Sequence, residues 1–569
     1  MRLPTPHFSP CLKSARYAQQ AAKGHLFNLS QKMMNWCGNL KEDTIMKMSR
    51  IIFAAAFAAI LFSCAKETIL DEETVAGTPK VSLTFNVTNE LSASKAVLNA
   101  NAVEFQAGDK IGVWDGTSMN CFETTAGGAH ASFSGTAADA ASYILVSPYS
   151  ENYSVNGSVV TYSIPDIQVA TPGSADPNAL VSIAKLTDPS GEAVLFNCVG
   201  LVKVVVPDGL VVKEIHIGGG ATSSVGICGS FTFNTDDQSL NYVSANSMRS
   251  SITLVPQAGQ SVIAPGTYYI AVRPWTYNGI TLAYVNADNQ LCKRTTANSV
   301  AVERNHIRPV GTFDTSNFTA VTGRATLRYA GDSPQFTGLI KKLAIGTSED
   351  LAANVTDNVI KKIVFRAHKL PYKAGGTSIH NGPNSDIAIL AWIDGDTAYV
   401  YTEAPVITLY STSGNLFRDF AALEEVSFND VNTQASASFE YMFRNCTKLK
   451  SVDFDNADFS KVTNFSYMFY TGASALEYVD LGGTATTAAT TMQSMFNNNQ
   501  YLKHLDLGPN FTLAATHTNM FLDAARQTSI AAAEDNEKKC QLYASQAFYD
   551  DVRNNEGTFN AARFYFHAQ

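Results

Sequence analysis

Residues 458–481 have the sequence DFSKVTNFSYMFYTGASALEYVDL and span one period of an internal repeat. The Met-Phe pair at 468–469 recurs from residues 442, 495 and 520, with spacings of 26, 27 and 25, and Leu416-Phe417 occupies the same place one period earlier. A second motif, Leu-x-x-(Val/Leu)-x-(Phe/Leu), follows as LEEVSF at 423–428, LKSVDF at 449–454, LEYVDL at 476–481 and LKHLDL at 502–507. A fixed period in this range predicts a solenoid, in which each repeat packs against its neighbours.

The apolar positions of one repeat predict which side chains fill its interior. We expect some of them to point inward from a short strand, others to fill the return path, and the next Met-Phe pair to close the following layer. These positions are Leu449, Val452, Phe454, Phe459, Val462, Phe465, Met468 and Phe469. A stripe of Met and aromatic residues also suits a ligand groove, but the regular spacing favours core packing.

Residues 416–525 resemble the BspA-type leucine-rich repeat of bacterial surface proteins. The resemblance to this repeat is weaker over residues 325–415. There, IKKIVF at 360–365 and IAILAWIDGDTAYVY at 387–401 are similar to the entry module of such proteins. Residues 526–569 are expected to form a C-terminal cap, because an unprotected last repeat would expose apolar surface. The resemblance implies adhesion to host matrix proteins or to other bacteria, without assigning any binding residue.

Aromatic and Arg side chains between the core positions are candidates for partner contacts, because such residues dominate the energetics of protein interfaces. The candidates are Tyr441, Arg444, Tyr467, Tyr470 and Tyr478. Each also fits an ordinary surface position, since single exposed aromatic residues are common.

The N-terminal half alternates short apolar strands with turn signals, which predicts a β-sandwich or a barrel. The expected strands are 81–88, 143–146, 159–164, 201–206, 211–217, 252–255, 267–272 and 279–285. Three further segments, FQAGDKIGVWDG at 105–116, PGTYYIAVRPWTYNGITLAYVNADN at 265–289 and HIRPVGTF at 306–313, resemble the fimbrillin family, lipoprotein subunits of Bacteroidota pili. That resemblance implies two β-sandwich domains, at 81–190 and 191–316.

Fimbrillins polymerise by strand exchange after a protease, in many members cutting after Arg, removes the first strand. This chain has no Arg between Cys64 and Arg249, which departs from that pattern. We therefore expect the protein to keep its lipid and to act as a pilus anchor, tip or accessory subunit, or as a stand-alone adhesin.

A secretory signal is predicted at residues 46–63, where a short basic head precedes an apolar run too short to span a bilayer. It ends in Leu61-Phe62-Ser63-Cys64, which resembles a bacterial lipobox and implies lipidation of Cys64. A buried helix ending in an ordinary cysteine is the alternative. Residues 1–45 then precede the true start, and 64–80 form an acidic tether to the outer membrane, facing the exterior.

Charge and motifs limit the function classes. The net charge is −9, and it becomes −15 without the first 64 residues, which carry eight Lys/Arg and two acids. An acidic body argues against nucleic acid as a partner. The sequence contains no HExxH, GxSxG, P-loop or GxGxxG element, and Asp394-Gly395-Asp396 fits a hairpin turn better than a calcium loop. We therefore predict no enzyme activity, cofactor or metal.

The predicted fold is mostly β, with two fimbrillin-like β-sandwich domains followed by a short α/β leucine-rich-repeat solenoid of BspA type. The predicted function is that of a pilus-associated, lipid-anchored cell-surface adhesin whose repeats contact other pilus subunits or surface proteins of the host or of bacteria. The alternative is a glycan-binding outer-membrane lipoprotein for polysaccharide capture, using exposed aromatics such as Trp114, Trp275 or Trp392. An enzyme would need an unrecognised site in 325–415.

Overall fold

The computed structural model describes residues 80–90, 104–219, 226–244, 247–328, 335–371, 375–428, 430–454, 457–471, 475–483, 485–527 and 536–569. This part of the chain is mostly β, with α-helices at α4 (Phe336–Ile345) and α6 (Gln546–Asn555). The predicted extension at 1–45, the signal at 46–63, the lipidated Cys64 and the tether up to residue 79 lie outside the described residues. Among the described residues, no helix is both long and apolar enough to cross a membrane.

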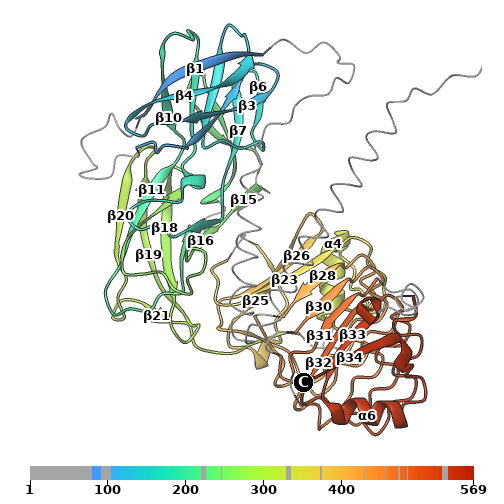
Figure 1. The fold of residues 1–569 in the computed structure, drawn as a ribbon. Coiled ribbons are helices and arrows are strands. Elements are labelled where there is room, and N and C mark those ends of the chain that lie inside the picture. The colour runs from blue at the N-terminus through green and yellow to red at the C-terminus, as the bar shows by residue number, and fades with distance from the viewer. Residues whose placement is uncertain are drawn as a thin grey trace, which may run out of the picture. The chain divides into compact units, whose positions relative to one another are not determined.

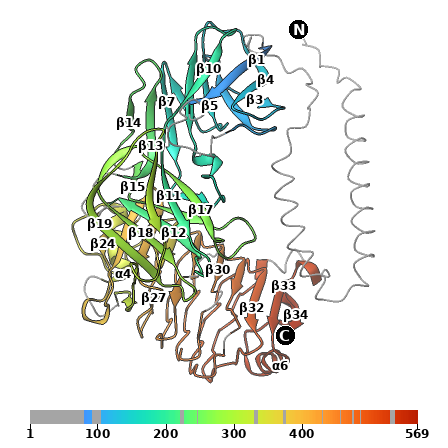
Figure 2. The same cartoon turned by 90° about the vertical axis from the view of Figure 1, so that its left-hand side faces the viewer.

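The first strands close into a barrel by hydrogen bonding, in the order β1-β10-β9-β5-β2-β3-β4 (Figure 2). Their bounds are β1 Lys80–Asn89, β2 Lys110–Trp114, β3 Met119–Thr124, β4 His130–Ala138, β5 Tyr143–Ser147, β9 Ser182–Leu186 and β10 Glu192–Asn197. Closure follows because β1 pairs antiparallel with β4 on one side and parallel with β10 on the other. The interior is aromatic: the ring centroid of Phe85 lies 5.4 Å from that of Phe122 and 5.1 Å from that of Tyr143. A closed ring leaves no free sheet edge, which differs from the expected sandwich.

The following strands form three sheets, in the orders β17-β11-β20, β21-β19-β18-β12-β16-β8 and β14-β13-β7-β6, with β15 beside β13. Their bounds are β6 Ser154–Asn156, β7 Val159–Ile164, β8 Ile167–Val169, β11 Gly200–Val206, β12 Glu214–Gly219, β13 Cys228–Asn234, β14 Leu240–Tyr242, β15 Met248–Arg249, β16 Ser251–Val255, β17 Gly266–Val272, β18 Trp275–Val285, β19 Leu291–Val302, β20 Ile307–Thr312 and β21 Thr319–Ala320. The pairing crosses the expected division at residue 190, because β7 pairs with β13 and β8 with β16, whereas β10 completes the barrel.

The predicted strands of this half match observed strands, with one shift. The segment expected at 211–217 begins as a strand only at Glu214. Before it, Val211 is exposed and Val212 makes an isolated bridge to Ile263. The apolar pattern therefore predicted a strand that starts three residues too early, in the segment that leads into β12.

The C-terminal part contains a ten-stranded sheet in the order β24-β25-β26-β23-β28-β30-β31-β32-β33-β34, whose later strands follow one another in parallel (Figure 1). The bounds are β23 Lys362–Arg366, β24 Thr377–Ser378, β25 Ile389–Asp394, β26 Thr397–Thr402, β28 Glu425–Ser427, β30 Ser451–Asp453, β31 Tyr478–Asp480, β32 His504–Gly508, β33 Cys540–Ala544 and β34 Phe564–Ala568; β22 Ala325–Thr326, β27 Ile407–Thr408 and β29 Val431–Asn432 form a small parallel sheet. Equivalent positions of the sequence repeat pair directly, as in Val452 with Val479 and Val479 with Leu505.

The Met-Phe pairs lie in the core, as predicted. Met442, Met468, Met495 and Met520 have no exposed surface. The rings of Phe443, Phe469, Phe496 and Phe521 form one continuous stack, with 5.5 Å between successive centroids. Each layer thus covers the apolar face of the one before it, which confirms core packing over a ligand groove at these positions.

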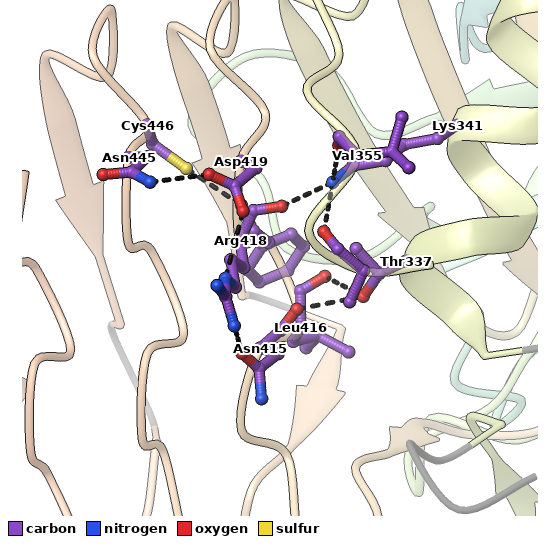
Figure 3. Close-up of polar contacts among 11 residues, drawn as sticks. Thr337, Lys341, Val355, Asn415, Leu416, Arg418, Asp419, Asn445 and Cys446 are labelled. Atoms are coloured by element: carbon purple, nitrogen blue, oxygen red, sulfur yellow. Dashed lines mark hydrogen bonds and ion pairs between the residues drawn. The ribbon is translucent and has the colours of Figure 1, made fainter. Parts of the chain in front are cut away.

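Helix α4 lies at the start of these layers and was not expected from the sequence. Its Lys341 is 1% exposed, and Nζ donates to the carbonyl oxygens of Ala353, Val355 and Arg418 at 2.6, 2.7 and 2.6 Å (Figure 3). Burial lowers the pKa of Lys341 to about 8. The ammonium group satisfies three carbonyls from two segments and so joins the helix to the first repeat.

The two ends of the repeats contain the expected local elements. The hairpin between β25 and β26 turns at Gly395, whose φ of 61° confirms the turn predicted for Asp394–Asp396. At the other end, the residues expected to form the cap contain strand β33 and helix α6, and Ser545 caps α6 by accepting a hydrogen bond from the Phe548 N–H at 3.2 Å. A further strand, β34, pairs in parallel with β33.

Candidate binding surface

One backbone position recurs in a left-handed conformation immediately before each apolar pair of the repeat. It is occupied by Asn415, Tyr441, Tyr467, Ser494 and Asn519, with φ between 53° and 63°. The backbone N–H there donates to the next layer; that of Tyr441 lies 3.1 Å from the Ser466 carbonyl oxygen. Asn tolerates this conformation, whereas a bulky side chain is strained in it by about 1 kcal/mol or more. Two successive Tyr residues at this position are therefore not explained by folding alone.

The two strained Tyr residues stack on each other. The ring centroids of Tyr441 and Tyr467 are 5.0 Å apart at an interplanar angle of 24°, and the ring of Tyr470 meets Tyr467 edge-on at 5.6 Å. The guanidinium carbon of Arg444 lies 4.9 Å from the Tyr441 centroid and 5.7 Å from that of Tyr470. We call this group, with Arg418, the turn-edge array.

Arg418 connects the array to the interior (Figure 3). Its guanidinium carbon lies 5.6 Å from the Tyr441 centroid, while Nη1 donates to Asn415 Oδ1 and Nε to Asp419 Oδ2, each at 3.0 Å. The buried carboxylate of Asp419 also accepts from Asn445 Nδ2 at 2.6 Å. These bonds hold the Arg418 side chain in place and so give one side of the array a rigid base.

Arg444 carries a charge that no carboxylate within the described residues neutralises at ion-pair distance. Its Nε is buried and has no hydrogen-bond partner among the groups that the structure describes. A buried donor without an acceptor costs about 1–3 kcal/mol. A carboxylate supplied by another molecule would neutralise the charge.

The structure brings together four of the five predicted contact residues, Tyr441, Arg444, Tyr467 and Tyr470. They are half-buried, whereas exposed positions were expected, because the array's side chains cover one another. Tyr478 is not part of this group and lies on β31 against His504. Sequence reasoning missed Arg418 and the left-handed position; the Asn, Ser or Tyr before each apolar pair was the available signal.

The Trp residues proposed for glycan binding are placed differently from one another. Trp392 is only 6% exposed, so the expectation that it is an exposed contact is wrong; it packs on Tyr399 at 5.8 Å. Trp114 is half-buried. Trp275 is 45% exposed, but the Arg273 guanidinium lies 4.3 Å from its ring centroid and covers a face that a sugar would need.

The cysteines of the described part are mostly core residues. Cys198, Cys228, Cys292, Cys446 and Cys540 are buried, and burial raises the pKa of Cys446 to about 12. Among the described residues, no three His, Cys, Asp or Glu side chains are grouped as a metal site would require.

Comparison with known proteins gives a partial match. A family model described as "Mycoplasma protein of unknown function, DUF285" matches residues 412–532. No curated protein matches the chain. Solved structures similar to this chain include a candidate cell adhesion protein from Bacteroides uniformis, at 16% identity and a TM-score of 0.28, covering 42% of this chain and 95% of that one. Another candidate cell adhesion protein, from Bacteroides ovatus, has 11% identity and a TM-score of 0.28, covering 43% and 96%. The tip fimbrial protein Mfa3 from Porphyromonas gingivalis has 9% identity and a TM-score of 0.19, covering 43% and 99%.

Proposed function

We propose that this chain is a cell-surface adhesin that binds protein partners through the turn-edge array. The observation that carries the proposal is the strained pair Tyr441 and Tyr467, stacked beside an Arg444 that has no carboxylate among the described residues. Strain of this kind persists where a function needs the residue. Stacked Tyr rings and an Arg form the kind of cluster that dominates binding energy at protein interfaces. The partner surface would present a carboxylate to Arg444.

The architecture that supports this role is a display scaffold. We propose two fimbrillin-like domains, divided in the sequence at 81–190 and 191–316 but exchanging strands across that division, with 325–415 as the entry module of a BspA-type leucine-rich-repeat region at 416–525 and 526–569 as its cap. The parallel pairing of equivalent repeat positions supports the solenoid. The chain would be anchored in the outer membrane by a lipid on Cys64, facing the exterior, as a pilus anchor, tip or accessory subunit.

The test is adhesion of whole cells that display the full chain, measured against panels of matrix proteins and partner bacteria. The double variant Tyr441→Asn/Tyr467→Asn installs the residue found at Asn415 and Asn519, so the backbone is expected to keep its conformation. Loss of two hot-spot rings should weaken adhesion at least about tenfold. Cells carrying Cys64→Ala should release the protein from the membrane fraction and lose adhesion altogether.

The matched control is Tyr501→Asn, because Tyr501 is 50% exposed and lies outside the array. It should adhere like the unmodified chain. Adhesion that survives the double variant, or that falls equally with Tyr501→Asn, would show that the turn-edge array is not the binding surface.

A further inference from the structure

A second group of aromatic side chains lies on the outer face of the parallel sheet. In strands β31, β32 and β33 the middle residues Val479, Leu505 and Leu542 are buried in the core. Successive strand residues point to opposite faces, so their neighbours face away from the core. We call this group the sheet-face array; it consists of Tyr478, His504, Tyr543, Tyr565 and His567. It shares no residue with the turn-edge array.

The rings of the sheet-face array stack from strand to strand. Tyr478 lies 4.4 Å from His504 at 13°, and Tyr543 lies 4.3 Å from His567 at 8°. His504 and Tyr543 join the two pairs, with centroids 4.9 Å apart. The two stacked pairs cover one face of each of their rings, while Tyr478 and Tyr565 remain 36% and 39% exposed.

On the same face, Asp453, Asp480 and Asp506 form one column, the Asp column, which continues in register into Tyr543 and His567 and lies next to the column of Tyr478 and His504. Asp453 pairs in register with Asp480, and Asp480 with Asp506, so their side chains repeat at the spacing of neighbouring strands, about 4.8 Å. Asp480 and Asp506 each accept one backbone hydrogen bond at 2.8 Å, from Gly482 and Gly508. Burial and the carboxylates of Asp480 and Asp453 raise the pKa of Tyr478 to about 12. Like charges in register are unfavourable, although Asp480 and Asp506 also serve the fold by accepting these two backbone hydrogen bonds.

In the preceding column of the sheet, which contains Glu424, Lys450, Glu477 and Lys503, the charges are paired. Lys450 pairs with Glu424, and Lys503 with Glu477, each at 2.8 Å. By contrast, no Lys or Arg of the described chain forms an ion pair with Asp480 or Asp506. Asp480 and Asp506 thus carry negative charge that no ion pair among the described residues neutralises, beside a rigid aromatic wall.

We propose that the sheet-face array and the carboxylates of Asp480 and Asp506 dock an arginine-bearing segment of a partner protein. Guanidinium groups pair with carboxylates through two parallel hydrogen bonds, which the Asp column can accept. Gln569 Nε2 donates to both carboxylate oxygens of Asp506 at 3.1 Å, and a charged guanidinium would displace this neutral amide. A sugar would instead stack on open ring faces, and here the stacked pairs Tyr478–His504 and Tyr543–His567 cover one face of each of these four rings. The site shares no residue with the adhesion surface proposed above, so a negative result for one proposal does not affect the other.

The experiment measures binding of a fluorescent hepta-arginine peptide to the purified full chain by anisotropy at physiological salt. The double variant Asp480→Asn/Asp506→Asn keeps the oxygens that accept from Gly482 and Gly508, so the strands are expected to stay intact. Its affinity for the peptide should fall at least tenfold. The control, Glu424→Gln/Glu477→Gln, removes the same total charge from the neighbouring column, whose carboxylates are already paired. It should change the affinity less than twofold.

Three results would overturn the proposal. One is the absence of peptide binding by the unmodified chain. Another is an equal loss in both double variants, which would mean attraction by the overall negative charge alone. The third is glycan binding on an array that disappears with Asp480→Asn/Asp506→Asn while peptide binding persists.

Discussion

The barrel and the repeat region bury their cores in opposite ways. In the barrel, Phe85 pairs with Phe133 and Val87 with Ala193, so β1 closes the ring through partners far along the chain, whereas β2–β3, β3–β4 and β9–β10 pair neighbours in the sequence. In the repeats, Val452 pairs with Val479 and Val479 with Leu505, each the same motif position one period later. Contacts in the repeats thus recur one period apart, whereas the contacts that close the barrel are long-range and made once. A repeat region can therefore vary its surface without redesigning its core.

The largest effect that tests this difference is expected when one layer of the repeats loses a buried ring. Phe469→Ala removes a ring between Phe443 and Phe496, and we expect a loss of about 3–5 kcal/mol. Because layers contact only their neighbours, hydrogen exchange measured by peptide should rise most around residues 442–496 and less toward α4. The measurement is exchange mass spectrometry of the full chain.

The companion variant is Phe133→Ala, which deletes a fully buried ring of the barrel. Exchange should then rise across all seven barrel strands together, because the ring closes through every one of them. If Phe469→Ala opened the whole repeat region uniformly, or Phe133→Ala opened only β4, the contrast between local and long-range packing would be wrong.

The second-largest effect is expected from acid, which should lower the stability of the N-terminal sheets around β12 and leave that of the repeats less affected. His216 on β12 is fully buried, with Nδ1 3.1 Å from Thr253 Oγ1, and burial lowers its pKa from 6.5 to about 4. Below pH 6.5, His216 therefore binds a proton in the unfolded chain but stays neutral in the folded chain. The free energy of unfolding therefore decreases as the pH falls from 6.5 to 4. Between pH 7 and pH 5 we expect a loss of about 2 kcal/mol.

The measurement is exchange in the β12 peptides at both pH values, corrected for the intrinsic rate. His216→Gln should remove most of the pH dependence there. Working above pH 5 avoids the titration of Glu214: burial opposes a lowering, but His216 and Lys369 together lower its pKa to about 2, so its effect comes only below its usual 4.5. An unchanged acid sensitivity in His216→Gln would assign the effect to other groups.

The smallest effect is expected from Tyr441→Asn. The change relieves left-handed strain of about 1 kcal/mol but removes a ring stack worth about 0.5–1.5 kcal/mol. The free energy of unfolding in urea should therefore change by less than about 1 kcal/mol. A loss above about 2 kcal/mol would make Tyr441 a structural residue and would weaken the case for a binding role.

The repeat was predictable because its core positions recur in the sequence, so the periodicity alone assigns Leu449, Val452, Met468 and Phe469 to one interior. Eight strands of the N-terminal half were also visible as apolar runs, whereas others, such as β4 and β19, were not expected. The partners of these strands were not visible, since nothing near β1 indicates that it closes a ring with β10 rather than forming the edge of a sandwich. Helix α4 was missed because its role depends on a single buried ammonium group and three distant carbonyls.

The sequence by itself determined the period of the repeat, the identity of its buried side chains and eight strands of the N-terminal half, because these follow from local periodicity and composition. Only the tertiary structure decided which side chains meet across layers. It placed Tyr441 on Tyr467, left Arg444 without a carboxylate among the described residues and aligned Asp480 with Asp506. The reason is physical: a periodicity reports which face of a strand is apolar, whereas stacking and ion pairing depend on backbone conformation and register.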